Sequence, residues 1–126
     1  MGFFYISDDG TVGDAEHGNA VVVLVAGGEI DYAVSPQLKE RIAGRIDEGF
    51  TRVVLDLSTA TFVDSTAIGA LVSAATRLHD LGEGTLAIVC PEENTRVLRI
   101  FEIAGVESLI ALHSSREEAV AELAVV

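Results

Sequence analysis

Short apolar runs alternate along this chain with longer segments whose apolar residues recur every three or four positions. Runs of β-branched residues are typical of buried strands, whereas a period of three to four is typical of amphipathic helices. The predicted strands are 20–26, 52–57, 85–89 and 109–112, with 62–63 touching the sheet again. The predicted helices run from Ser35 to Gly49, from Asp64 to Gly82, from after Asn94 to Gly105, and from Ser115 to Leu123. This order predicts a largely parallel sheet with right-handed crossovers.

Residues 1–19 precede this alternation. Phe3–Ser7 is apolar and predicts a short edge strand, which would pair antiparallel and make the sheet mixed. Asp8–Asn19 contains three glycines and several acids, the composition of a flexible loop or a wide hairpin connection. A chain of 126 residues suffices for one domain with its own core and is too short for two. We expect a single α/β domain over 1–126, with four to five strands packed against about four helices.

Local signals predict where several elements begin and end. Gly27-Gly28 is expected to stop the strand that precedes it, with 29–31 in a loop or a strand extension. Ser35 is expected to cap the first helix, because Pro36 behind it fits the first turn, where no amide hydrogen is needed. Ser115 and Glu118 have the spacing of a capping box at the start of the last helix.

Acidic residues outnumber basic ones by 20 to 8, which gives a formal net charge of -12. Such a surface repels nucleic-acid phosphates and anionic membranes, so we expect neither as a partner. A protein partner is compatible with the charge, and so is a role in solubility alone. The apolar runs are too short to cross a bilayer, and the N-terminus lacks the pattern of a signal peptide. The single cysteine, Cys90, permits no intrachain disulfide and is expected to be buried, so a cytoplasmic location is expected.

Candidate catalytic and metal-binding residues do not form a recognisable pattern. His17, His79 and His113 lack the spacing of metal ligands, and 82–85 lacks the length and lysine of a phosphate-binding loop. Asp56 lies where a two-component receiver domain keeps its phospho-accepting aspartate. The acidic pair and the final lysine that such a receiver needs are missing from the sequence. We therefore expect no cofactor, no metal and no enzymatic activity, with Asp56 as part of a strand end.

The segment 62–69, Phe-Val-Asp-Ser-Thr-Ala-Ile-Gly, joins a predicted strand to a predicted helix. Asp64 or Ser65 suits the helix N-cap, the ordinary role of these residue types. A hydroxyl at this position is also suited to phosphorylation, which would add about -1.5 to -2 charge units beside Asp64. The helix dipole and free amides would tolerate that charge, whereas a partner docked on an uncharged Ser65 would not.

Small residues follow this motif on the same predicted helix. They are Ala67, Gly69, Ala70, Ser73 and Ala74. They predict a flat, uncharged outer face that suits close docking of a partner, or close packing of a neighbouring element.

Four segments in order resemble the STAS domain family, and within it the bacterial anti-sigma factor antagonists. They are 28–31, 53–57, 62–69 and 96–106, and the resemblance extends from about Ala20 to Leu123. It implies a STAS-type fold and a protein that binds an anti-sigma factor, usually a serine kinase with a GHKL-type ATP site, and so releases a sigma factor. In the family the kinase phosphorylates the serine after the motif aspartate, here Ser65. The phosphorylated antagonist dissociates, and a PP2C-type phosphatase restores it.

The resemblance also implies which residues face the partner. Asp31, Asp64, Ser65 and Thr66 follow from the motifs, and Ala70 and Ser73 from the small-residue face. The family commonly has glycine at the position of Ala67, where alanine strains a backbone of positive φ but suits ordinary helix. The alternative function is a STAS scaffold module of a stress-signalling assembly, without a phospho-switch. We expect a monomer or a weak dimer.

Overall fold

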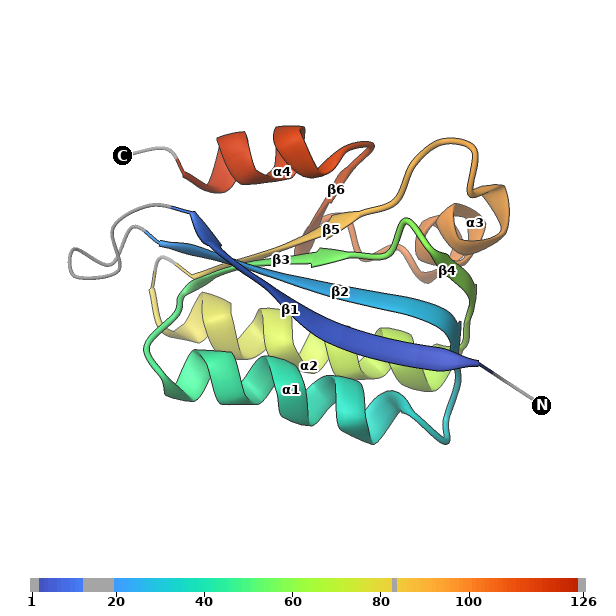
Figure 1. Cartoon of the computed structure of the whole chain (residues 1–126), viewed down its shortest axis with the longest axis horizontal. Helices are drawn as coiled ribbons and strands as arrows, with labels where there is room; N and C mark the ends of the chain where they lie inside the picture. Colours follow the sequence, from blue (N-terminus) through green and yellow to red (C-terminus); the bar gives the residue numbers. More distant parts are fainter. Residues whose placement is uncertain (1–2, 13–19, 83, 125–126) are drawn as a thin grey trace.

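A computed structural model describes residues 3–12, 20–82 and 84–124 of the chain. Within them a six-stranded mixed sheet has α1 and α2 on one face and α4 on the other (Figure 1). The strand order is β1-β2-β3-β5-β6, and β4 pairs with β2 off this path. The strands are β1 (Phe4–Val12), β2 (Val21–Ile30), β3 (Arg52–Asp56), β4 (Ala60–Val63), β5 (Thr85–Val89) and β6 (Ile110–His113). The helices are α1 (Ser35–Asp47), α2 (Ser65–Asp80), α3 (Thr95–Ala104) and α4 (Arg116–Leu123).

The central strands are buried on both faces, which explains why they are continuous apolar runs. β2, β3, β5 and β6 pair in parallel, and β1 pairs antiparallel with β2 at the edge. The larger core includes Leu24, Leu55 and Ile88, and the smaller one packs Val54 and Ala87 with residues of α4. The predicted α/β fold with a mixed, mostly parallel sheet is confirmed. None of the helices in the described ranges is long and apolar enough to span a membrane.

The N-terminal strand is longer than its composition predicts. β1 continues past Ser7 to Val12, with a bulge between Asp8 and Thr11, so the expectation of a loop was wrong for 8–12. Acidic residues are accommodated in this strand because the Asp8 carboxylate lies 2.7 Å from Nη1 of Arg45 on α1. The rest of the predicted loop, 13–19, lies outside the described residues.

The glycine pair in β2 does not end the strand, as the sequence suggested, but lets it lie close beside β1. Gly28 has a φ of +81°, and a Cβ there would collide with the carbonyl oxygen of Phe3. A Cβ on Gly27 would collide with the ring of Tyr5 and the hydroxyl of Thr59. Because both glycines lack a side chain, β1 approaches closely and β2 continues to Ile30, where β4 replaces β3 as its parallel neighbour.

Two helix starts test the predicted caps. Ser35 does not cap α1: the N-cap position is Val34, and the Ser35 hydroxyl instead donates to the carbonyl oxygen of Tyr32 at 3.4 Å. The prediction at α4 is confirmed, since the Ser115 hydroxyl oxygen accepts the amide of Glu118 at 3.2 Å. The Glu118 carboxylate in turn accepts the Ser115 hydroxyl at 3.2 Å.

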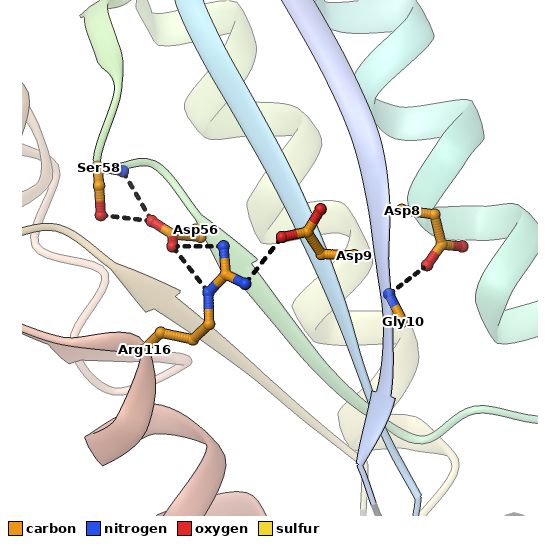
Figure 2. Close-up of polar contacts among 6 residues, drawn as sticks. All are labelled: Asp8, Asp9, Gly10, Asp56, Ser58 and Arg116. Atoms are coloured by element: carbon orange, nitrogen blue, oxygen red, sulfur yellow. Dashed lines mark hydrogen bonds and ion pairs between the residues drawn. The ribbon is translucent and has the colours of Figure 1, made fainter.

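Arg116, the first residue of α4, ties that helix to two strands (Figure 2). Its Nε and Nη2 lie 3.1 and 3.0 Å from Oδ2 of the buried Asp56, and its Nη1 lies 2.8 Å from Oδ2 of Asp9. Oδ1 of Asp56 accepts the amide of Ser58 at 2.9 Å and the Ser58 hydroxyl at 2.5 Å. Both carboxylate oxygens of Asp56 are thus engaged at the strand end, which is the structural role expected for it.

Gly28→Ala is expected to destabilise the protein by at least about 1–3 kcal/mol, because alanine is strained at positive φ and its Cβ would displace β1. The matched control is Gly44→Ala in α1, where a Cβ meets no atom within 4 Å. That change should be neutral or stabilise by up to about 1 kcal/mol. Urea unfolding of both variants measures the difference, and similar free energies of unfolding would contradict the prediction.

Arg116→Met is expected to lower the free energy of unfolding by about 1–3 kcal/mol, because it leaves the buried Asp56 carboxylate without its cation. Arg77→Met is the control, since the Arg77–Asp47 ion pair is exposed and its loss should change stability by less than about 1 kcal/mol. Equal losses in the two variants, measured by thermal or urea unfolding, would show that burial of Asp56 adds nothing.

Candidate functional site

The predicted site lies where the loop after β2 meets the first turn of α2. The amide of Asp64 donates to the carbonyl oxygen of Ile30 at 3.2 Å, which fixes the start of α2 against the end of β2. The backbone N–H of Tyr32 is also close enough to the Asp64 carboxylate to help lower its pKa. The two segments are therefore held together, although 33 positions separate Asp31 from Asp64 in the sequence.

Asp64 caps α2, which settles the choice between Asp64 and Ser65. Its Oδ1 accepts the amides of Thr66 and Ala67, both at 3.0 Å, and the Thr66 hydroxyl at 2.6 Å. Burial opposes ionisation of this carboxyl, but the hydrogen bonds from the Thr66 hydroxyl and from the amides of Ala67, Tyr32 and Thr66 outweigh it and lower the pKa of Asp64. Asp64 is therefore a carboxylate at neutral pH.

Ser65 is the first residue of α2, and its side chain is exposed. Among the described residues, none forms a hydrogen bond with its hydroxyl, so this group is open to solvent or to a partner. Free amides were expected at the start of this helix, but the amides of the next three residues are already hydrogen-bonded. Those of Thr66 and Ala67 bind the Asp64 carboxylate, and that of Ile68 binds the Asp64 carbonyl oxygen at 3.1 Å. Negative charge added at Ser65 would therefore meet an ionised carboxylate and amides already in use.

The small residues of α2 do not all form an outer face. Gly69 and Ser73 are exposed, whereas Ala67, Ala70 and Ala74 are buried. Their helical spacing places the three alanines on an inner stripe where α2 packs, and their size allows the helix to approach closely. Of the residues predicted to face a partner, Ala70 therefore lies below the surface.

The alanine that replaces the usual glycine has an ordinary helical backbone. Ala67 belongs to α2, and every positive φ among the described residues is that of a glycine. The strained alternative for Ala67 is thus excluded, and its methyl group adds to the core.

The loop after β2 is fixed by its own backbone. The Asp31 carboxylate accepts the amide of Ala33 at 3.0 Å, and the Asp31 carbonyl oxygen accepts the amides of Val34 and Ser35 at 3.1 and 2.9 Å. This turn presents the side chain of Tyr32 to solvent, with 73% of its surface exposed. Sequence reasoning missed Tyr32, whose only signal was an aromatic residue placed in a polar turn.

The other reactive groups of the described residues were compared with their predicted roles. No group of three or more His, Cys, Asp or Glu side chains in the described part of the chain is arranged to hold a metal ion. Cys90 is buried, as expected, and burial raises the pKa of its thiol to about 11. Nε2 of His113 lies 3.5 Å from the Glu122 carboxylate, and His79 is exposed. His17 lies outside the described residues.

Comparisons with known proteins point to one family. A family profile described as the STAS domain matches residues 14–119. A Bordetella bronchiseptica protein provisionally named anti-sigma factor antagonist BtrV is 30% identical over 103 residues, which cover 82% of this chain and 86% of that protein.

Solved structures agree on the fold. An anti-sigma factor antagonist from Mycobacterium paratuberculosis superposes with a TM-score of 0.77 at 20% identity, covering 94% of each chain. The anti-sigma factor antagonist SpoIIAA in its unphosphorylated form gives a TM-score of 0.75 at 18% identity, covering 97% of this chain and 99% of that chain. The Bacillus SpoIIAA structure in its phosphorylated form gives 0.61 at 22% identity, covering 82% and 90%.

Asp64→Ala is expected to lower the free energy of unfolding by about 0.5–2 kcal/mol, because it removes the cap of α2, whereas Asp64→Asn should lose less because asparagine also caps. The pKa of Asp64 is lowered in the folded state, so its charge stabilises the fold above the usual carboxyl pKa of about 4 and ceases to do so as the pH falls through the lowered value. The stability gap between wild type and Asp64→Asn should therefore shrink below pH 4 in urea titrations. A gap that stays constant with pH would contradict this assignment.

Proposed function

The chain belongs to the STAS domain family, and we propose that it is an anti-sigma factor antagonist whose binding to an anti-sigma factor is controlled by phosphorylation of Ser65. The observation that carries the proposal is the exposed, unbonded hydroxyl of Ser65 at the start of α2, beside the ionised Asp64. The antagonists among its relatives support the first half of the proposal, and the structure of SpoIIAA in a phosphorylated form supports the second.

In the proposed unphosphorylated state, the partner contacts the surface formed by Asp31, Asp64, Ser65, Thr66 and Ser73, with Ala70 packed beneath it. The anti-sigma factor is a serine kinase that transfers the γ-phosphoryl group of ATP to the Ser65 oxygen, with ADP as the leaving group and release of the hydroxyl proton. A PP2C-type phosphatase hydrolyses the ester with water, which restores the Ser65 hydroxyl and releases inorganic phosphate. The chain itself acts in the cytoplasm as a ligand and a kinase substrate rather than as an enzyme.

Phosphorylation weakens binding in this proposal because of charge. The phosphate adds about -1.5 to -2 units beside a carboxylate that is already ionised. The amides of Thr66 and Ala67, which would otherwise solvate an anion at a helix start, are bound to Asp64. The added charge therefore projects toward the partner and must lose water when the two surfaces meet, which is unfavourable without a cation to receive it.

Ser65→Asp is expected to weaken binding to the anti-sigma factor at least about tenfold, whereas Ser65→Ala should bind like wild type and accept no phosphate. The serine-kinase anti-sigma factors encoded by the source organism serve as probes, with calorimetry for affinity and intact mass after incubation with ATP for modification. Ser108→Asp is the matched control, because Ser108 is exposed beside Gly84 and Thr85, at the opposite edge of the sheet. Undiminished binding by Ser65→Asp would overturn the switch and favour a scaffold role.

A further inference from the structure

We infer that the partner-binding surface extends from Ser65 across four exposed aromatic side chains, and that the anti-sigma factor covers them with an apolar surface. The four are Phe3, Tyr5, Tyr32 and Phe62, called here the aromatic patch. This inference rests on the proposed function and adds to it the chemistry of the contact.

Most of the aromatic residues of this chain lie at the surface rather than in the core. The sequence has seven, five Phe and two Tyr, and four of them are exposed. The exposed fractions are 73% for Tyr32, 58% for Phe3, 38% for Phe62 and 37% for Tyr5. Isolated exposed apolar residues are normal, but exposed aromatics gathered at one place mark an interaction site.

All four lie at the same end of the molecule. The start of β1, the end of β2, β4 and the first turns of α1 and α2 meet at the right-hand end of Figure 1. The rings of Phe3 and Tyr5 pack edge to face, with centroids 5.6 Å apart. The Phe3 carbonyl oxygen accepts the amide of Glu29, and Glu29 pairs in register with Phe62.

Backbone hydrogen bonds bring the aromatic patch close to Ser65. The Asp64 amide donates to the carbonyl oxygen of Ile30, two residues before Tyr32, and Asp64 caps α2 directly before Ser65. Phe62 precedes Asp64 by two residues in β4, and the start of β4 is held by a hydrogen bond between the hydroxyls of Tyr5 and Thr59, 2.5 Å apart. The backbone of the patch and that of Ser65 therefore belong to one continuous part of the structure. An aromatic side chain has few rotatable bonds, so it loses little conformational entropy on binding, which favours its use as an anchor.

Interface size requires more surface than Ser65 and its neighbours provide. A stable protein–protein contact uses about 800 Å² and 20–30 residues on each partner, and Tyr and other aromatics are enriched at its centre. The proposed Ser65 surface contains five exposed or half-exposed residues, all small or acidic. The aromatic patch adds the large apolar groups that such a contact needs for affinity.

Charge argues for a different protein rather than a second copy of this chain. The charged residues between the aromatics and Ser65 are Glu29, Asp31 and Asp64, all acidic. A two-fold contact between identical patches would bring these carboxylates together. An apolar partner surface also explains the proposed switch, because a phosphate at the rim of an apolar contact loses its water without compensation.

The test measures the affinity of the same anti-sigma factor for Tyr32→Ala, Phe62→Ala and Phe3→Ala. Tyr32→Ala and Phe62→Ala should each weaken binding at least about tenfold, in the range of interface hot spots, and Phe3→Ala should weaken it less because the ring of Tyr5, which packs against Phe3, remains in the patch. Leu81→Ala is the matched control, since Leu81 is 56% exposed at the far end of α2, and it should bind within about twofold of wild type. Circular dichroism and thermal unfolding confirm that each variant is folded.

The outcomes separate this inference from the proposed function. If Ser65→Asp loses binding while Tyr32→Ala and Phe62→Ala bind like wild type, the inference is overturned and the proposed function stands. If wild type binds no anti-sigma factor, both fail. If the aromatic variants bind the anti-sigma factor normally but abolish a self-association seen by sedimentation velocity, the patch serves a second copy of the chain and the inference is overturned.

Discussion

The carboxylate of Asp64 is the contact on which the arrangement of this end of the molecule depends. It accepts hydrogen bonds from the first turn of α2, while the Asp64 amide binds the end of β2. One residue thus starts a helix, holds that helix against a neighbouring strand and sets the charge beside Ser65. Because the Asp64 carboxylate binds the amides of Thr66 and Ala67, few hydrogen-bond donors remain at the start of α2 for a second anion.

The pattern of apolar residues along the sequence was sufficient to predict much of the fold. Strand β5 has the predicted bounds, and the parallel order, the antiparallel edge strand and the end of α3 at Gly105 were all expected. These features follow from local composition: a buried parallel strand must be apolar on both faces, and glycine is favoured where φ is positive. A cap at Asp64 or Ser65 was predictable for the same reason, because a capping bond spans only two or three residues, and the structure assigns it to Asp64.

Features that depend on distant contacts were not predictable from local pattern. β1 extends through Asp8 and Asp9 because Arg45 and Arg116 reach them from helices far along the chain. The sequence of the Gly27-Gly28 pair indicates the end of a strand. Only the structure shows that the pair makes room for the backbone of Phe3. The alanines of α2 have the spacing of one helix face, and sequence alone does not say whether that face turns inward or outward. Tyr32 was missed because exposure of an aromatic residue is a property of the assembled surface.

The ion pair between Asp9 and Arg116 has a consequence for how the domain is completed during synthesis. It joins residues 107 positions apart, one in the first strand and one in the last helix. Until α4 has left the ribosome, the sheet face that it covers, including Val54 and Ala87, is without its helix, and Asp56 has no cation. β1 and α4 are therefore fastened together late, and native packing of that face has to wait until α4 has been synthesised.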